Sequence, residues 1–206
     1  RTLNFVTAPR VTVLDHSGMD LAAVFSPDEI ATMQAQGRYC GTPLENKIEF
    51  MGRLCYDSHA AGRPTGDYFA NIIASRHSSV AEHATISLLF QGVSRGLTHE
   101  LVRQRVGMSY SQRSTRYCDE GAAGYVMPVE SDDSVEVTSA YFGNIREVYK
   151  REYGKALARL GDRKRARGVA RAWLPNGTET EIGVTFNLVS LFHFLAIRGS
   201  RHAERE

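Results

Sequence analysis

The sequence predicts an α+β fold, in which helices pack on a mostly antiparallel sheet. Segments that alternate apolar and polar residues are interspersed with longer segments that repeat apolar residues at helical spacing, an order typical of that class. With 206 residues, 42% of them apolar, the chain can bury a substantial core and has the ordinary size of one domain. No internal repeat or low-complexity linker divides it, so we expect residues 1–206 to form a single domain.

The N-terminal third predicts one strand followed by three helices. Residues 4–14 carry enough apolar and β-branched side chains in alternation for a first strand. Ser26-Pro27 reads as an N-cap with proline at the first helical position, and Thr42-Pro43 repeats that signal. Residues 67–75 favour a third helix. The helix after Thr42-Pro43 should bury an apolar face made of Ile48, Met51, Leu54 and Cys55.

The rest of the chain predicts two strands and four helices. Strand patterns occupy residues 84–90 and 178–186, the second after a turn signal at Pro175-Asn176-Gly177. Helical patterns cover residues 95–105, 135–160, 163–173 and 188–198.

Composition excludes several classes of protein. A net charge of +2 is too small for a general binder of polymeric nucleic acid, so the arginines matter through clustering. Three cysteines without a CxxC pair argue against a disulfide framework and predict a reducing, cytoplasmic setting. The longest nearly apolar run, 188–197, is far shorter than the roughly 18 residues of a membrane span, and no signal peptide is visible. The chain begins without Met and stops inside an expected helix, so we expect terminal residues to be missing.

Arginines and hydroxyl-bearing side chains crowd the stretch from residue 103 to residue 117. The guanidinium groups, planar forks of donors suited to phosphate, belong to Arg103, Arg105, Arg113 and Arg116. The hydroxyls, which can hydrogen-bond a sugar or a base, belong to Ser109, Ser111, Ser114 and Thr115. The stretch therefore predicts a site for a phosphorylated partner. Because no base is assured beside it, we interpret Ser114 as an orienting hydroxyl rather than a nucleophile.

Other polar groups have both a structural and a functional interpretation. On a helix over 95–105, Arg95, His99 and Arg103 share one face, and composition alone favours a solvated surface with charge pairs. The cluster His77, Glu82 and His83 lacks a cysteine or a third close ligand, so we expect no metal and favour a cofactor contact. His83 is equally compatible with a partly buried, hydrogen-bonded histidine. The rings of Tyr110 and Tyr117 suit either stacking on a ligand or the core.

Several short motifs follow one another along the chain. Arg103-Gln104-Arg105 precedes Ser114-Thr115-Arg116-Tyr117, and the segment from His77 to His83 reads His-x-x-x-x-Glu-His. Further motifs are Gly92-Val93-Ser94-Arg95, His99-Glu100-Leu101, Arg171 to Asn176, and Asn187 to Ala203. Together they resemble the signature of the flavin-dependent thymidylate synthases (ThyX-like), which includes Arg-His-Arg, a short spacer and Ser-x-Arg-Tyr. The resemblance covers roughly residues 50 to 206, and it is specific because the motifs agree in order.

The resemblance implies the fold of that family and a role for each matching residue. Arg116 and Arg171 resemble the pair that binds the nucleotide monophosphate, although without the resemblance Arg171 would belong to a basic face over residues 163–167. Arg198 resembles the arginine at the pyrimidine carbonyl and, with Ser114, would be catalytic. The nucleotide would be bound by Glu100, Arg103, Gln112, Arg113, Ser114, Thr115, Arg116, Arg171 and Arg198. The flavin would be bound by His77, Ser79, Glu82, Arg103, Gln104, Arg105, Asn187, His193 and His202.

Two positions and one spacer depart from the family pattern. Gln104 replaces the central histidine, and it can donate a hydrogen bond but cannot titrate. Val189 stands where many relatives have arginine, which should weaken the contacts to the flavin phosphates. The spacer Val106-Gly107-Met108 replaces two residues, so the loop should bulge near the sugar. These departures imply altered specificity and resemble the uridylate C5-methylase of polyoxin nucleoside-antibiotic biosynthesis, so we expect UMP to be accepted as well as dUMP.

The resemblance implies C5-methylation of a uracil nucleotide monophosphate, dUMP or UMP. Methylenetetrahydrofolate would donate the one-carbon unit, and NADPH would supply reducing equivalents through FAD. A homotetramer is also implied, with active sites that draw residues from several subunits. The alternative is a non-catalytic module that binds RNA or nucleotides through the arginine- and tyrosine-rich loop. A third possibility is a decayed member of the family that retains only the fold.

Overall fold

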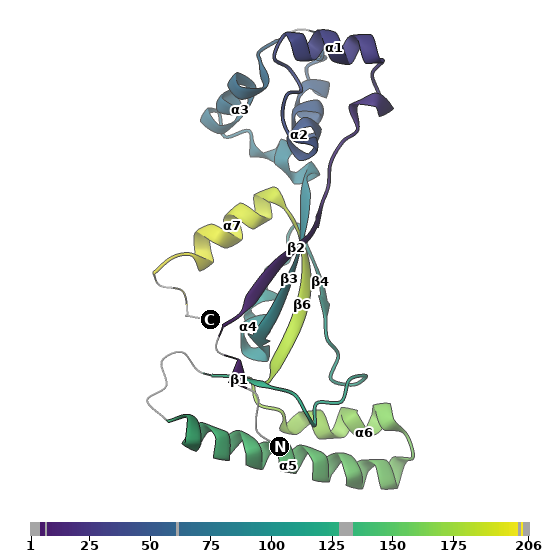
Figure 1. Ribbon diagram of the computed structural model, residues 1–206, viewed down its shortest axis with the longest axis vertical. Helices are drawn as coiled ribbons and strands as arrows, with labels where there is room; N and C mark the ends of the chain where they lie inside the picture. The colour runs from purple at the N-terminus through teal and green to yellow at the C-terminus, as the bar shows by residue number, and fades with distance from the viewer. Residues whose placement is uncertain (1–4, 7, 61, 128–133, 202, 204–206) are drawn as a thin grey trace.

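The computed structural model describes residues 5, 6, 8–60, 62–127, 134–201 and 203. These residues form an elongated molecule with three regions along its long axis (Figure 1). A helical region lies at one end, a sheet flanked by two helices in the middle, and a pair of helices at the other end. The first region contains η1 (Leu21–Ala23), α1 (Pro27–Ala35), α2 (Pro43–Leu54), α3 (Thr65–Ala74) and η2 (Ser78–His83).

The central sheet is antiparallel throughout, with strand order β2-β3-β6-β4. Its strands are β2 (Arg10–His16), β3 (Thr85–Ser94), β4 (Met108–Gln112) and β6 (Glu179–Asn187). The two helices at the other end of the molecule are α5 (Val135–Leu160) and α6 (Arg163–Ala170), which continues into η3 (Arg171–Trp173). A small parallel pair of strands, β1 (Phe5–Val6) and β5 (Tyr125–Val126), lies near them. The predicted α+β class with a mostly antiparallel sheet is confirmed.

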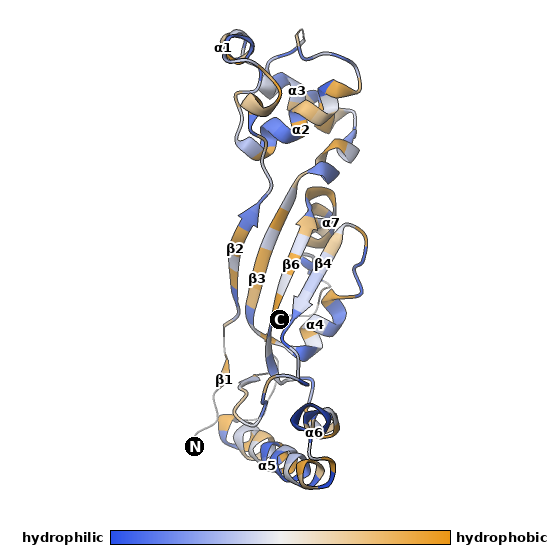
Figure 2. Cartoon of the chain, turned by 90° about the vertical axis from the view of Figure 1, so that its right-hand side faces the viewer, coloured by the Kyte–Doolittle hydropathy of each residue, from blue (hydrophilic) through white to orange (hydrophobic). Residues whose placement is uncertain are grey.

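One face of the sheet carries the apolar core. Ile182, Val184 and Phe186 alternate along β6 and are buried against α4 (Arg95–Leu101) and α7 (Leu188–Arg198). Figure 2 views the sheet with α4 and α7 behind it. The opposite face is polar: the Ser87 and Thr185 hydroxyls are 2.9 Å apart and hydrogen-bonded. Alternate residues of a strand point to opposite faces of the sheet. The apolar residues of β6 therefore pack on α4 and α7, and its polar residues lie on the opposite face.

Several predicted elements are confirmed within a few residues. The helices α1, α3, α5 and α7 and the strands β3 and β6 lie where the patterns indicated. Ser26 and Thr42 both form complete capping boxes, with Glu29 and Glu45 respectively, which explains why α1 and α2 begin where they do. None of the described helices is long and apolar enough to cross a membrane.

The face that α2 buries differs from the predicted one. Leu54 is 57% exposed and Cys55 is also exposed, whereas Glu49 and Arg53 are buried beside Ile48. Glu49 and Arg53 form an ion pair at 2.7 Å, so each charge has a partner that makes its burial tolerable. Hydrophobic periodicity assigns such residues to the surface, and the prediction for Leu54 and Cys55 is therefore wrong.

Three boundaries were also predicted wrongly. Residues 108–112, interpreted as part of a polar binding stretch, form β4, in which Met108 and Tyr110 face the core and the alternating Ser109 and Ser111 are exposed. The helix expected over 95–105 ends at Leu101. The strand expected over 4–14 is two strands, and Pro9, which has no backbone N–H to donate, lies between them.

Candidate functional site

The predicted site residues are distributed over three places in the described chain. One group lies at η2 and the start of α7, a second between α4 and α7, and a third where β4 leads into a turn against α6. The nine residues of β6 run from the third group to the first. At roughly 3.4 Å per residue these ends are about 27 Å apart. One chain therefore does not gather all the predicted residues into one pocket.

A cavity of about 310 Å³ lies between α4 and α7 and brings together four of the predicted residues. It is lined by Glu100, Leu101, Arg103, Gln104, Phe194 and Arg198. Arg103 Nη1 contacts Glu100 Oε2 at 2.7 Å, and both side chains are substantially exposed, 68% and 40%. An exposed ion pair contributes little stability, so Arg103 can exchange this partner for a ligand. This exposed ion pair agrees in part with the alternative interpretation, in which this helix face is a solvated surface with charge pairs.

The spacer before β4 is fixed against the N-terminus of α7. Ser190 Oγ donates a hydrogen bond to the Val106 carbonyl at 2.7 Å, and the Asn187 N–H donates to the Gly107 carbonyl at 2.8 Å. Asn187 Oδ1 accepts from the Ser190 N–H and caps α7. Gly107 has φ +66°, and a Cβ there would lie 2.3 Å from Asn187 Nδ2. Glycine is thus required at 107, and the oxygen of Asn187 is used within the chain.

The group at η2 is exposed. His77, Ser79, Glu82 and His83 all lie on the surface, so His83 is not the partly buried histidine that was one alternative. No cluster of three or more His, Cys, Asp or Glu side chains suited to a metal occurs among the described residues. His193 is exposed on α7, and His202 lies outside the described residues.

The turn that carries the Ser-x-Arg-Tyr motif packs against α6. Arg167 Nη1 donates to the Tyr117 carbonyl at 2.8 Å, and Lys164 Nζ lies 4.3 Å from the centre of the Tyr117 ring. The Cys118 N–H donates to the Ser114 carbonyl at 2.9 Å. Thr115 is buried, whereas the Arg116 side chain is exposed beside it. The basic face of α6 therefore positions this turn and leaves Arg116 available for a ligand.

A cluster of charges lies beside this turn. Arg113 Nε is 3.8 Å from Oε1 of the buried Glu120, and Arg95 also interacts electrostatically with that carboxylate. Burial raises the pKa of Glu120, and the two arginines oppose the rise. Burial lowers the pKa of Arg95, and repulsion from Arg171 lowers it further. Arg171 lies within electrostatic range of Arg95, and its side chain is exposed.

Two side chains considered for ligand contacts, those of Gln112 and Tyr110, form hydrogen bonds within the chain instead. Gln112 Nε2 donates to Thr98 Oγ1 at 2.8 Å, which ties β4 to α4 rather than to the Ser114 turn. The Tyr110 hydroxyl donates to the Leu101 carbonyl at 3.0 Å, and its ring packs on the core. Tyr110 thus has the core role that was one of its alternatives, whereas Tyr117 lies under Lys164.

Sequence patterns do not identify several residues at the Ser114 turn and in the charged cluster. Lys164 and Arg167, which hold the turn, are three residues apart and so lie on one side of a helix, but composition marks them only as part of a basic face. Arg95 was noted on the face of its helix but was not assigned to the site. Glu120 follows the Ser-x-Arg-Tyr motif without any periodic signal, so nothing in the pattern marks it as buried.

Comparison with known proteins decides the family. The model of the family described as "Thymidylate synthase complementing protein" (Thy1) matches residues 41–206. The chain is 40% identical over 173 residues to a flavin-dependent thymidylate synthase of Mycobacterium avium, covering 77% of this chain and 69% of that protein. This chain belongs to the flavin-dependent thymidylate synthase family. The enzyme class predicted from the motifs, a ThyX-like methyltransferase, is confirmed by this membership.

Further relatives of this family agree. A flavin-dependent thymidylate synthase of Mycobacterium marinum is 41% identical over 176 residues, covering 79% of this chain and 70% of that protein. The solved structure of ThyX from Helicobacter pylori with FAD and dUMP has a TM-score of 0.63 at 18% identity, covering 94% and 86% of the two chains. The UMP/dUMP methylase PolB from Streptomyces cacaoi, bound with 5-Br UMP, gives 0.60 at 19% identity, covering 94% and 78%. These two likenesses show a shared fold.

Proposed function

We propose that this enzyme methylates C5 of a uracil nucleotide monophosphate, with methylenetetrahydrofolate, NADPH and FAD as co-reactants. The observation that carries the proposal is the separation of two exposed arginine sites: the charged cluster at the Ser114 turn, and the cavity that holds Arg103 and Arg198. A nucleotide presents a phosphate and a polar ring, and these need different donors. Family membership and the solved relatives that bind UMP or dUMP analogues support the same substrate class.

The phosphate suits the turn at Ser114. Arg116 and Arg171 are exposed, and guanidinium groups bind phosphate oxygens in bidentate, charge-assisted hydrogen bonds. The buried Thr115 and the α6 contacts to Tyr117 hold the backbone on either side of Arg116, so less freedom is lost on binding. The Ser114 hydroxyl would orient the nucleotide. Lys164, although basic, is already placed over the Tyr117 ring.

The pyrimidine suits the cavity between α4 and α7. Its volume of about 310 Å³ can accept one ring system but not an entire extended dinucleotide. Arg198 would present a fixed positive charge to the ring carbonyl, where electron density accumulates as C5 reacts. The phenyl ring of Phe194 supplies an apolar wall, and Gln104 can donate a hydrogen bond.

The donor set around this cavity fits a flavin in part. Arg103 and Gln104 offer N–H donors to ring or phosphate oxygens, and the exposed Ser79, Glu82 and His77 offer further polar contacts beyond the cavity. A bound FAD would supply hydride chemistry, which no side chain of the chain can provide. Within this chain, the task of these residues would be to bind, to orient and to exclude water.

The arrangement favours active sites built from more than one chain, and we propose a homotetramer. No residue of the Ser114 turn lines the cavity between α4 and α7. Large apolar side chains are also exposed: Phe192 is 61% and Leu195 54% exposed on α7, and Val13 is 57% exposed on β2. Burial of these side chains against another subunit would be favourable.

Acceptance of UMP as well as dUMP remains part of the proposal, but its sequence-based explanation changes. Met108 begins β4, pairs with Phe186 and packs on the core. The strand separates the spacer from Ser114 in the same chain, so the spacer cannot widen a sugar pocket there directly. Deleting Met108 would shift the register of β4 and turn its side chains over. The spacer would instead affect the sugar through the cavity between α4 and α7, or by contacting the nucleotide bound to another subunit.

Tritium release from C5-labelled UMP and dUMP, measured side by side with FAD, NADPH and methylenetetrahydrofolate, tests the proposal. The protein should be yellow, should bleach with NADPH and should release tritium from both nucleotides. Arg198→Lys should fold normally but turn over far more slowly, because lysine keeps the charge and loses the planar fork. A colourless protein that carries nucleic acid and releases no tritium would support the binding-module alternative instead.

A further inference from the structure

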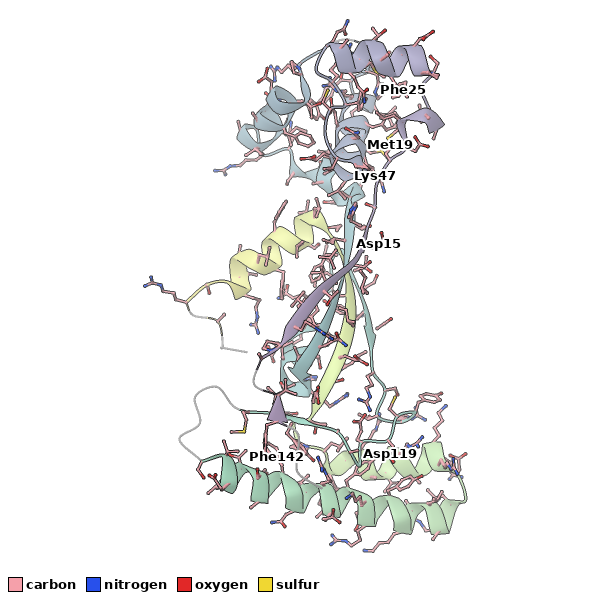
Figure 3. All side chains as sticks on the ribbon, in the orientation of Figure 1. Asp15, Met19, Phe25, Lys47, Asp119 and Phe142 are labelled. Atoms are coloured by element: carbon pink, nitrogen blue, oxygen red, sulfur yellow. The ribbon has the colours of Figure 1, made fainter. Side chains whose placement is uncertain are left out.

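Glu120 lies beneath the charged cluster and is nearly inaccessible to solvent. Its side chain is 2% exposed, and its Oε2 has no hydrogen-bond partner among the described residues. Figure 3 shows its neighbour Asp119 in the loop between the sheet and the α5–α6 pair. Burying a carboxylate oxygen without a hydrogen-bond partner lowers the stability of the folded state. Such a group therefore calls for an explanation, and a functional role is one.

The backbone holds Glu120 firmly in this place. Its N–H donates to the Tyr149 hydroxyl of α5 at 3.3 Å, and its carbonyl accepts from the Ala123 N–H at 3.1 Å. Asp119 accepts from the Gly121 N–H at 2.9 Å, which closes the turn. Tyr149 itself is 1% exposed. The backbone of Glu120 is therefore fixed by α5 and its own turn, independently of any arginine.

Glu120 is the buried counter-charge among the arginines of the cluster, while the carboxylates Asp119 and Glu179 lie nearby. Arg113 lies 3.8 Å from Glu120 Oε1, and Arg95 interacts with the same carboxylate. Arg95 and Arg171 repel one another, and Arg95 is half-buried, where repulsion is poorly screened. Without Glu120, the guanidinium groups would move apart into solvent. The carboxylate forms an ion pair with Arg113 and attracts Arg95 electrostatically from a buried position, so it can hold the two guanidinium groups close together.

We propose that Glu120 is a positioning residue, which holds Arg95 and Arg113 so that the cluster with Arg171 is preformed for the substrate phosphate. Glu120 does not touch the substrate. The 3.8 Å contact is an ion pair and is too long for a good hydrogen bond, so Glu120 does not use up the N–H donors of Arg113 and they can bind a phosphate. This inference rests on the proposed function, because it assigns a phosphate-bearing substrate to the cluster.

The test compares Glu120→Gln with Glu179→Gln. Glu179 is a nearby, half-buried carboxylate that forms no ion pair with the described residues, so its variant removes the same charge without the same contact. Binding of UMP, dUMP and uridine is measured by calorimetry, together with thermal unfolding and the steady-state constants. Glu120→Gln should weaken binding of both monophosphates roughly tenfold, as for one lost charge-assisted hydrogen bond. It should leave uridine binding and kcat nearly unchanged, so the effect lies in KM.

A double-mutant cycle with Arg113→Lys separates positioning from general damage. If Glu120 acts through Arg113, the double variant should bind UMP little worse than the weaker single variant. Unchanged UMP binding by Glu120→Gln, an equal loss with Glu179→Gln, or fully additive losses would overturn the inference. Should Glu120→Gln not fold, Glu120→Asp replaces it, and UMP binding equal to wild type in that variant would likewise overturn the inference. A wild-type protein that binds neither UMP nor dUMP would instead reject the proposed function.

Discussion

The two ends of the molecule each contain a buried glutamate beside an arginine. The two pairs differ in how many of their polar atoms have hydrogen-bond partners. In the helical region, Glu49 accepts from Arg53 Nε at 2.8 Å and from the Thr65 hydroxyl at 2.8 Å. Arg53 also donates to the Arg63 carbonyl at 2.6 Å and lies 4.7 Å from the Tyr68 ring centre. Arg53 is 1% exposed and Glu49 is fully buried.

The pair at the other end is open. Arg113 is 37% exposed, its contact with Glu120 is 3.8 Å, and Oε2 of Glu120 is unpartnered among the described residues. Where Glu49 accepts from a hydroxyl, Glu120 interacts electrostatically with Arg113 and Arg95, and the carboxylates Asp119 and Glu179 lie nearby. The comparison shows that burial of a charged pair does not by itself indicate function. A pair whose polar atoms all have partners indicates a structural role, whereas a pair with a partly exposed arginine and an unpartnered carboxylate oxygen is a candidate for a functional site.

The largest expected effect is on the closed pair. Glu49→Ala should lower the free energy of unfolding by about 3–5 kcal/mol, because Arg53 would be left buried without its partner. The control is Glu147→Ala, which removes a glutamate that is 69% exposed and paired with Lys150. That change should cost at most about 1 kcal/mol. Urea unfolding measures both, and equal midpoints for the two variants would contradict the assignment of Glu49–Arg53 as a structural pair.

The next effect concerns the open cluster. Arg116→Ala and Arg171→Ala should each weaken binding of a nucleotide monophosphate by about 1.5–3 kcal/mol, the loss of one charge-assisted hydrogen bond. Both side chains are exposed, so the free energy of unfolding should barely change. Calorimetry with UMP and with uridine checks this. Equal losses for nucleotide and nucleoside would show that these arginines do not bind the phosphate.

The smallest effect is a difference in pH response between the two ends. Burial lowers the pKa of His59, which packs on Phe50 and Tyr39, below its ordinary 6.5. Its contribution to stability is therefore present above pH 6.5 and is lost as the pH falls through that range. Burial raises the pKa of Glu120 above 4.5, so its contribution is present at low pH and is lost as the pH rises.

Acidification from pH 7 to pH 4, which covers the ordinary pKa values of both groups, should thus act on the two ends with opposite signs. His59→Gln should lose less stability than wild type over this range, and Glu120→Gln should lose more, because each variant removes one of the opposing titrations. Urea midpoints at four or five pH values measure the curves. Parallel curves for wild type and both variants would show that neither group titrates differently in the folded state.

The same comparison explains how far the sequence could predict this molecule. Alternation and capping signals located the helices and most strands because each depends on neighbouring residues, as at Ser26 and Thr42. The α2 face was wrong because Glu49 and Arg53 are buried only through contacts from Thr65, Tyr68 and the chain near Arg63, which no local pattern encodes. The strand β4 was missed because its exposed serines read as part of a polar loop.

For the candidate site, the motifs indicate which residues to consider, and the structure shows how they are arranged. Motifs named the exposed arginines, and the structure brings Glu100, Arg103, Gln104 and Arg198 to one cavity. Motifs could not indicate that Gln112 bonds to Thr98, or that Glu120 is buried beneath Arg113. These relations depend on packing between segments far apart in the sequence. Nor could spacing show that β4 separates the spacer from Ser114.

The most direct test of the account is complementation between subunits. Arg116→Ala and Arg198→Lys are each expected to be nearly inactive, because one disables the phosphate site and the other the cavity. If the two sites meet only between chains, refolding the variants together should restore about a quarter of the active sites in randomly mixed oligomers. Tritium release from labelled dUMP or UMP measures the recovery, and native mass spectrometry confirms mixing. Mixed oligomers without recovered activity would contradict an active site shared between chains.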